Sequence, residues 1–138
     1  MKIRKVTKKD LGIISKLYEN EMSKNFKDVG EKYITKNENK KILNKNIASS
    51  NMFVLENNKI EGFIWYKKEG REFNLEEIFV INKSKGHGRS LIEFMLKDAK
   101  KNKIKQINGD AHFNNKRAML FLKKFGFSER TVEMSLDL

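Results

Sequence analysis

The most constraining feature of this sequence is a basic turn with two glycines, placed between an apolar stretch and an amphipathic one. Glycine lets the backbone come close to a ligand, and the first turn of a helix offers unpaired N–H groups and a partial positive charge. The pattern predicts that main-chain N–H groups from about Lys85 to Ser90 hold a phosphate. The glycines and the side chains that we expect around it are Gly86, Gly88, Lys83, Lys85, His87 and Arg89, and His87 is expected to face solvent.

Two better-known phosphate-binding turns do not fit this stretch. A dinucleotide-binding turn requires a third glycine and an acidic residue about 20 positions further on, and a Walker turn requires Gly-Lys followed by Ser or Thr. Neither pattern is found around Gly86. The remaining interpretation is a pyrophosphate held by backbone N–H groups, and this implies a nucleotide-like ligand.

Composition excludes several kinds of chemistry. The 138 residues include no cysteine, and this excludes disulfides, thiolate metal ligands and a cysteine nucleophile. Only His87 and His112 offer imidazole ligands, and they lie far apart in the sequence, so no metal site is expected. Residues 1–6 contain no hydrophobic leader, and no apolar run reaches the roughly 20 residues that span a bilayer. We therefore expect a cytoplasmic protein without a membrane partner.

The net charge of +12 raises the question of nucleic acid binding. Lysine and asparagine are spread along the whole chain, as on a solvated surface. The densest basic stretches, residues 36–45 and 97–103, contain no aromatic residue that could stack on a base. Attraction to an anionic cofactor or an acidic partner explains the charge better, and a basic nucleic-acid-binding domain is kept as a lesser alternative.

Hydrophobic periodicity predicts one α/β domain over residues 1–138, with the order β-α-α-β-β-β-α-β-α-β. Thr7 and Asp10 resemble a capping pair at the start of the first helix. Asn57-Asn58 favours a tight hairpin between strands at residues 52–56 and 60–68, because asparagine tolerates positive φ. A third strand is expected at residues 73–81, before the glycine turn.

The second half of the chain predicts a crossover. A helix after Gly88 leads to a strand at residues 104–113, and a further helix ends at Gly126, which suits a C-cap. A helical connection of this kind joins two parallel strands. The chain then alternates strictly between apolar and polar residues, so we expect a final strand that carries Val132, Met134, Leu136 and Leu138.

Two motifs in this half resemble those of a known family. The turn from Lys83 to Gly88 is similar to Arg/Gln-x-x-Gly-x-Gly/Ala, with lysine in the first position. The stretch from Asn115 to Phe127 matches Asn-x-x-Ala-x-x-x-Tyr-x-x-x-Gly-Phe, except that Leu122 stands at the tyrosine position. Both motifs, at this separation, resemble the GCN5-related N-acetyltransferases, which transfer an acetyl group from acetyl-CoA to an amine. The order of elements resembles this family over nearly the whole chain.

The resemblance implies a mixed central sheet of about six to seven strands flanked by about four helices. It also implies acetyl-CoA as co-substrate, an acceptor that is a small-molecule or protein amine, and a homodimer as a frequent assembly. In the family a backbone N–H of the strand before the turn binds the acetyl carbonyl oxygen, and here this implies Ile78 or Val80. The cofactor residues implied in this way are Ile78, Phe79, Val80, Ser90 and Asn115, together with the basic turn.

Acetyl transfer to an amine also requires a base, since the attacking nitrogen must be neutral. The resemblance implies a base on one of two neighbouring strands, and the candidates are Asp110, Glu76 and His112. Without a cysteine, the implied mechanism is direct attack in a ternary complex. Leu122 cannot donate a proton to the leaving thiolate, as the family's tyrosine does in many members. A non-catalytic acyl-CoA-binding module is therefore the alternative hypothesis.

Overall fold

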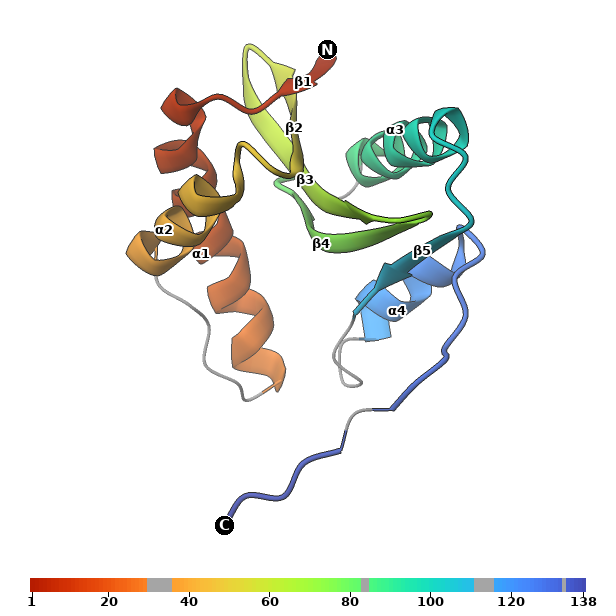
Figure 1. Ribbon diagram of the computed structural model, residues 1–138. Helices are drawn as coiled ribbons and strands as arrows, with labels where there is room; N and C mark the ends of the chain where they lie inside the picture. The colour runs from red at the N-terminus through yellow and green to blue at the C-terminus, as the bar shows by residue number, and fades with distance from the viewer. Residues whose placement is uncertain (30–35, 83–84, 111–115, 133) are drawn as a thin grey trace.

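The computed structural model of this chain describes residues 1–29, 36–82, 85–110, 116–132 and 134–138 (Figure 1). Its centre is a five-stranded sheet in the order β1-β2-β3-β4-β5. The first four strands are antiparallel to their neighbours, and β5 is parallel to β4. The strands are β1 (Lys2–Lys5), β2 (Asn51–Asn57), β3 (Lys59–Glu69), β4 (Glu72–Val80) and β5 (Gln106–Gly109).

Helices cover both faces of this sheet, which confirms the expected mixed α/β architecture (Figure 1). One face packs against α1 (Leu11–Val29) and α2 (Lys36–Asn46). The other face packs against α3 (His87–Lys101) and α4 (Lys116–Lys123). A short 3-10 helix, η1 (Lys8–Asp10), leads into α1. None of the described helices is long and apolar enough to cross a membrane.

Each face of the sheet has its own apolar cluster. The cluster under α1 and α2 includes Leu11, Leu43, Phe63 and Trp65, all buried. The cluster under α3 is built on Tyr66, Phe73 and the inner face of that helix, and half-buried Phe121 on α4 and Phe125 just after α4 pack against it. The inner face of α3 consists of its buried residues Leu91, Ile92, Met95 and Ala99, whereas Leu96, which shares the apolar pattern, is exposed. The two clusters together hold β3 and β4 between helical layers.

The predicted cap at the start of the helical region is confirmed. The backbone N–H of Thr7 donates to Asp10 Oδ2 at 2.8 Å, and Arg4 donates to both oxygens of the same carboxylate at 2.9 and 3.0 Å. Hydrogen bonds from Arg4 lower the pKa of Asp10 to about 2. A buried, paired carboxylate therefore fixes how the chain turns from β1 into α1.

The predicted hairpin between β2 and β3 is also confirmed. Asn58 has a φ of 65°, as the Asn-Asn turn requires, and the next turn places Gly70 at a φ of 60°. Asparagine and glycine adopt this left-handed region at little cost. Two tight turns thus bring β2, β3 and β4 together as a meander, and this meander positions the end of β4.

Two expectations about the strands are wrong. The sheet has five strands in the described part of the chain, rather than six to seven. Residues 131–138, expected as a final strand, run away from the sheet without strand pairing in their described part (Figure 1). Alternation predicts an extended chain, but a strand also needs a neighbour that accepts its hydrogen bonds. The expected strand at residues 104–113 is shorter, since β5 ends at Gly109.

Candidate active site

The strands β4 and β5 pair over only part of their length. The parallel register runs from Glu72 opposite Gln106 to Leu75 opposite Gly109. Beyond Leu75, β4 continues to Val80, whereas β5 ends at Gly109. The carboxyl-terminal half of β4 therefore has no β5 partner in the described residues, and in parallel sheets such ends are where ligands commonly bind.

A bulge in β4 begins at the point where this pairing stops. Trp65 pairs with Glu77, while the next residue of β3, Tyr66, pairs with Leu75. Glu76 is thus the extra residue on β4, and the faces of the strand switch there. Leu75 and Ile78 accordingly both pack against the α3 cluster, although residues three apart on a regular strand point to opposite faces.

The bulge also separates the two neighbouring glutamates. Glu76, one of the three predicted candidates for the base, is exposed to solvent. Glu77 is opposite Trp65, which belongs to the cluster under α1 and α2. The Oε1 atom of Glu77 is buried and has no hydrogen-bond partner in the described part of the chain. The Glu77 side chain therefore points to the α1 side of the sheet from the half of β4 that does not pair with β5.

Burial alone raises the pKa of the Glu77 carboxyl to about 8. Tyr18 on α1 interacts with this carboxyl, because the pKa of Tyr18 rises to about 12 through burial and through the charge of Glu77. The Tyr18 ring lies edge-on to Phe79, with 6.4 Å between centroids. The Nε1 of Trp65 is likewise buried without a hydrogen-bond partner. Glu77 thus sits in aromatic surroundings that favour its protonated form.

Sequence reasoning missed Glu77 because the bulge decides its direction. A regular strand would place one of Glu76 and Glu77 on each face, and the pattern alone does not say which face is covered near the end of β4. The spacing of Leu75 and Ile78 carried a signal, since two apolar residues three apart on one strand suggest a bulge between them.

The backbone of β4 past the bulge has donors on its outer edge. The N–H of Ile81 donates to the carbonyl of Glu61 on β3 at 3.0 Å. Antiparallel pairs alternate between bonded and non-bonded positions, so Phe79 also faces β3 and the N–H groups of Ile78 and Val80 point the other way. The side chain of Phe79 is buried. The predicted contacts of Ile78, Phe79 and Val80 with a cofactor stay predictions.

The glycine turn opens α3 in a left-handed conformation. Gly86 has φ 74° and ψ 14° and is the N-cap of the helix, without a side-chain cap. The first helical bond runs from the N–H of Ser90 to the Gly86 carbonyl at 3.1 Å. The N–H groups of His87, Gly88 and Arg89 therefore lack helical partners, and the first turn carries no acidic residue. Among the N–H groups from Lys85 to Ser90 that were expected to hold a phosphate, the N–H of Ser90 is already bonded within the helix.

The two glycines of the turn have different tasks. A Cβ at Gly86 would meet no atom within 4 Å, so glycine is required there for its positive φ and not for lack of space. A Cβ at Gly88 would lie 3.1 Å from Cζ of Phe121 on α4. Gly88 therefore allows α4 to pack against the start of α3, and this packing places the N-terminus of α3 beside α4.

The basic side chains of the turn are mostly in solvent. Lys85 is exposed, and Arg89 pairs with Glu93 at 3.6 Å while lying 5.2 Å from the ring of Phe125. His87, expected as a solvent-facing residue, is instead buried, with Nδ1 3.5 Å from Glu61 Oε2. That expectation was wrong because the left-handed cap turns His87 inward, toward the carboxylate on β3.

The remaining predicted residues lie in or next to parts that the structure does not describe. Asp110 directly follows β5 and is exposed. Since Gly109 is opposite Leu75, Asp110 lies at the level of the bulge. Lys83, His112 and Asn115 fall outside the described residues. The structure therefore brings together the end of β4, the end of β5 and the start of α3, and the roles predicted for these three residues stay predictions.

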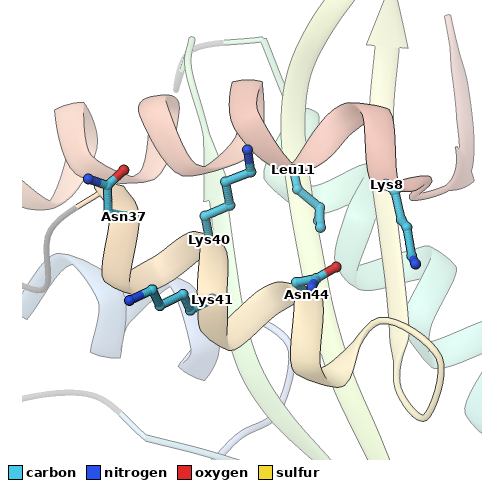
Figure 2. Close-up of a pocket in the computed structure, with 6 residues that line it drawn as sticks. All are labelled: Lys8, Leu11, Asn37, Lys40, Lys41 and Asn44. Carbon is cyan, nitrogen blue, oxygen red and sulfur yellow. The ribbon is translucent and has the colours of Figure 1, made fainter.

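A separate open pocket of about 440 Å³ lies between α2 and the start of α1 (Figure 2). None of the residues predicted for the cofactor or the base lines it. The lining side chains come from η1, α1 and α2, and Lys40 extends from α2 toward α1 (Figure 2). They are Lys8, Leu11, Asn37, Lys40, Lys41 and Asn44.

Comparisons with known proteins match this arrangement. The structure is similar to a mutant of the BH1408 protein from Bacillus halodurans, with a TM-score of 0.81, 18% identity, and coverage of 100% of this chain and 99% of that one. It is similar to the PaiA N-acetyltransferase from Thermoplasma acidophilum in complex with coenzyme A, with a TM-score of 0.77, 16% identity, and coverage of 96% and 92%.

A predicted acetyltransferase from Clostridium acetobutylicum, solved with acetyl-CoA, is similar with a TM-score of 0.72, 18% identity, and coverage of 99% and 95%. A comparison with curated proteins gives no match. The profile of the acetyltransferase (GNAT) domain matches residues 3–133, nearly the whole chain. The chain therefore belongs to the GNAT acetyltransferase domain family.

Proposed function

We propose that this GNAT domain transfers the acetyl group of acetyl-CoA to a primary amine by direct attack in a ternary complex, with Glu77 as general base. GNAT domains use acetyl-CoA as co-substrate, and acetyl transfer is the chemistry that the family shares. The observation that carries the proposal is the position of Glu77, a carboxyl with a raised pKa beside the half of β4 that β5 leaves unpaired.

The residues present fit a CoA pyrophosphate at the start of α3. Three N–H groups lack helical partners there, Gly86 leaves open space above the turn, and the first turn contains no carboxylate. A negative charge at a helix N-terminus gains about 0.3–1 kcal/mol from the helix dipole, and charge-assisted hydrogen bonds add to this. Lys85 and Arg89 supply further positive charge, so this end of α3 favours an anion.

The same geometry suits the thioester. A pyrophosphate at α3 directs the rest of the cofactor along the open edge of β4, where the N–H groups of Ile78 and Val80 point. Such a donor, placed where negative charge develops on the acetyl oxygen, is often the largest single contribution to catalysis. We assign this role to Ile78 or Val80.

The proton balance of the reaction requires a base. An amine with a pKa near 10.4 is almost wholly protonated at pH 7, so a neutral nitrogen has to be produced in the site. The ammonium first loses one proton to solvent. The neutral nitrogen then bonds to the acetyl carbon, the carbon–sulfur bond breaks with its electron pair on sulfur, and the second proton to leave the nitrogen passes to the Glu77 carboxylate. A base with a pKa near the working pH is well matched to this task.

The leaving thiolate needs no protein acid in this scheme. Leu122 occupies the family's tyrosine position, and it is half-buried on α4. A thiol has a pKa near 8.5, so solvent can protonate the departing sulfur. The loss of a general acid costs rate but leaves the transfer possible.

A panel of amines tests the proposal. The purified protein is mixed with acetyl-CoA and with small amines, lysine peptides or peptides with a free N-terminus, and the released thiol is measured. We expect release that depends on an amine, and Glu77→Gln is expected to lower kcat/KM by about 10²–10⁴. Glu72→Gln, an exposed glutamate on the same strand, serves as the matched control and keeps the wild-type rate.

The same assay separates the predicted bases. Glu76→Gln and Asp110→Asn are expected to change the rate less than Glu77→Gln, because both side chains are exposed. Full activity of the Glu77→Gln variant, with a large loss in one of the other two, would contradict the assignment of Glu77 and return the role to that residue.

Leu122 favours a second candidate function, a non-catalytic acyl-CoA-binding module. A hydrocarbon side chain at this position cannot protonate the thiolate. Calorimetry that shows tight CoA binding, together with no thiol release on any amine of the panel, would select this alternative.

A further inference from the structure

Glu61 on β3 is an extra residue in the ladder between β2 and β3. Gly62 and Ile60 pair with consecutive residues of β2, so Glu61 between them has no partner on that strand. The faces of β3 switch at this point, because Ile60 and Phe63 both pack in the cluster under α1 and α2 although they are three residues apart. A bulge of this kind redirects the side chain that it carries.

The Glu61 side chain contacts the first residue of α3. Its Oε2 atom lies 3.5 Å from Nδ1 of His87, and the two side chains are 15% and 4% exposed. Nδ1 of His87 is buried and has no hydrogen-bond partner in the part of the chain that the structure describes. A buried polar nitrogen without a partner is costly, so the Glu61 carboxylate is the group that stabilises the inward position of His87.

The backbone of Glu61 holds the end of β4. Its carbonyl accepts a hydrogen bond at 3.0 Å from the N–H of Ile81, which directly follows the last residue of β4. The neighbour of Glu61, Gly62, pairs with Val80 in the ladder between β3 and β4. One residue of β3 therefore contacts both the end of β4 and the start of α3.

Gly62 brings α3 close to the same point of β3. A Cβ at Gly62 would lie 3.1 Å from Cδ1 of Leu91 and 3.2 Å from Cγ1 of Val80. Leu91 is four residues after His87, so both side chains lie on the same face of α3, and both are buried. The start of α3 thus contacts two neighbouring residues of β3, Gly62 through close packing and Glu61 through a polar side chain.

The two ends that Glu61 joins carry the two groups of backbone donors proposed for the cofactor. The N–H groups at the start of α3 favour a diphosphate, and those of Ile78 and Val80 point to the open edge of β4. A ligand that binds two linked sites gains affinity only when the distance between the sites fits its length. Donors that are held in place before binding also cost less to align.

We propose that Glu61 is a positioning residue for the coenzyme, because it holds the first turn of α3, through His87, at a fixed distance from the end of β4. This inference rests on the proposed function, which takes the start of α3 as the diphosphate site and the edge of β4 as the thioester site. Glu61 itself contacts neither part of the coenzyme. Its side chain therefore affects donors that span both sites and leaves shorter donors unaffected.

Two acetyl donors of different length test the proposal. Acetyl-CoA reaches both sites, whereas S-acetylpantetheine lacks the diphosphate and the nucleotide and reaches only β4. Glu61→Ala removes the contact with His87 and keeps the backbone hydrogen bond to Ile81. We expect it to weaken CoA binding in calorimetry, and to raise KM for acetyl-CoA, by about tenfold or more. We expect kcat with acetyl-CoA and kcat/KM with S-acetylpantetheine to stay unchanged.

Glu69→Ala, an exposed glutamate further along β3, is the matched control and is expected to keep the wild-type values with both donors. Equal losses of Glu61→Ala with the two donors would overturn the proposal, because a general loss of structure lowers both alike. Glu61→Leu keeps a bulky side chain at the bulge and guards against a folding defect of Glu61→Ala. Unchanged CoA affinity in either folded variant would overturn the proposal as well.

A double-mutant cycle tests whether Glu61 acts through His87. His87→Leu replaces the buried ring with an apolar side chain and is expected to lose CoA affinity by a factor similar to that of Glu61→Ala. Glu61→Ala in the His87→Leu background is then expected to lose no more. Losses that multiply would show that the two residues act independently, and would overturn the proposal.

Failure of the proposed function gives a different result. The wild type then binds CoA but releases no thiol with any amine, and calorimetry on the same variants still decides the role of Glu61. Acetyl transfer by the wild type, together with wild-type CoA affinity in Glu61→Ala, would overturn the role of Glu61 alone. A wild type without measurable CoA affinity would overturn both.

Discussion

Glu77 pairs with Trp65 across the β3–β4 ladder although Tyr66 pairs with Leu75, so one residue, Glu76, has no partner on β3. This single extra residue decides which glutamate points to solvent and which points under α1. It lies where β5 stops pairing with β4. The bulge therefore puts the Glu77 carboxyl and the unpaired edge of β4 at the same level of the sheet. The proposed catalysis depends on this arrangement.

The first prediction concerns the stability of the fold against pH. The pKa of Glu77 is about 8 in the folded protein against 4.5 for an ordinary glutamate, so the folded state holds this proton more tightly. Between these values the free energy of unfolding falls as pH rises, by up to about 1.4 kcal/mol per pH unit. Glu77→Gln is expected to flatten this slope in urea unfolding at pH 5, 7 and 9, while Glu76→Gln keeps it.

A second prediction concerns the free energy of unfolding at acidic pH. The pKa of Asp10 is about 2 in the folded state against 3.8 for an ordinary aspartate, because Arg4 donates two hydrogen bonds to its carboxylate. The stability that this pair contributes is present above pH 4 and is lost as pH falls toward about 2. Asp10→Asn is expected to cost about 1–3 kcal/mol at pH 7 and little at pH 2. An equal cost at both pH values would show that the charge of Asp10 is not involved.

A third prediction tests the anion site at α3. Gly86→Glu places a carboxylate at a helix start that has no acidic residue, so CoA affinity measured by calorimetry is expected to fall by at least about tenfold. Gly70→Glu is the matched control. Gly70 has a φ of 60° against 74° for Gly86, so both variants carry similar backbone strain, but Gly70 lies in the β3–β4 turn. Equal losses of affinity in the two variants would point to strain alone.

A fourth prediction tests the contact between α3 and α4. Gly88→Ala brings a Cβ to 3.1 Å from the Phe121 ring, so α4 has to shift. Overpacking of this kind costs typically about 1–3 kcal/mol, measured by thermal or urea unfolding. Gly12→Ala, on α1 with nothing within 4 Å, is the control, and it is expected to be neutral or stabilising. Phe121→Leu in the Gly88→Ala background should restore part of the loss; no restoration would place the strain elsewhere.

Features set by local chemistry could be predicted from the sequence. The Asn57-Asn58 hairpin, the Thr7–Asp10 cap and the glycine start of α3 each depend on the conformational preferences of a few neighbouring residues. The parallel pairing of β4 with β5 followed from a general rule about helical crossovers. The two family motifs then gave the family, and its match over residues 3–133 confirms it.

Features set by distant contacts could not be predicted in this way. The bulge at Glu76 is a register shift against β3, so the strand pattern alone could not show which of Glu76 and Glu77 points under α1. His87 is buried with its ring next to Glu61, a residue that lies far away in the sequence on β3. The final alternating stretch reads as a strand in isolation, but its described residues pair with no strand of the sheet. In each case the deciding neighbour is far away in the sequence.

The most direct test of the account is the pH dependence of kcat/KM with one acceptor amine of known pKa. In the wild type we expect two rising phases, one near pH 8 from Glu77 and one from the amine itself. In Glu77→Gln the phase near pH 8 is expected to disappear, while the phase of the amine remains. A Glu77→Gln profile with the same two phases as the wild type would contradict the assignment of Glu77 as the base.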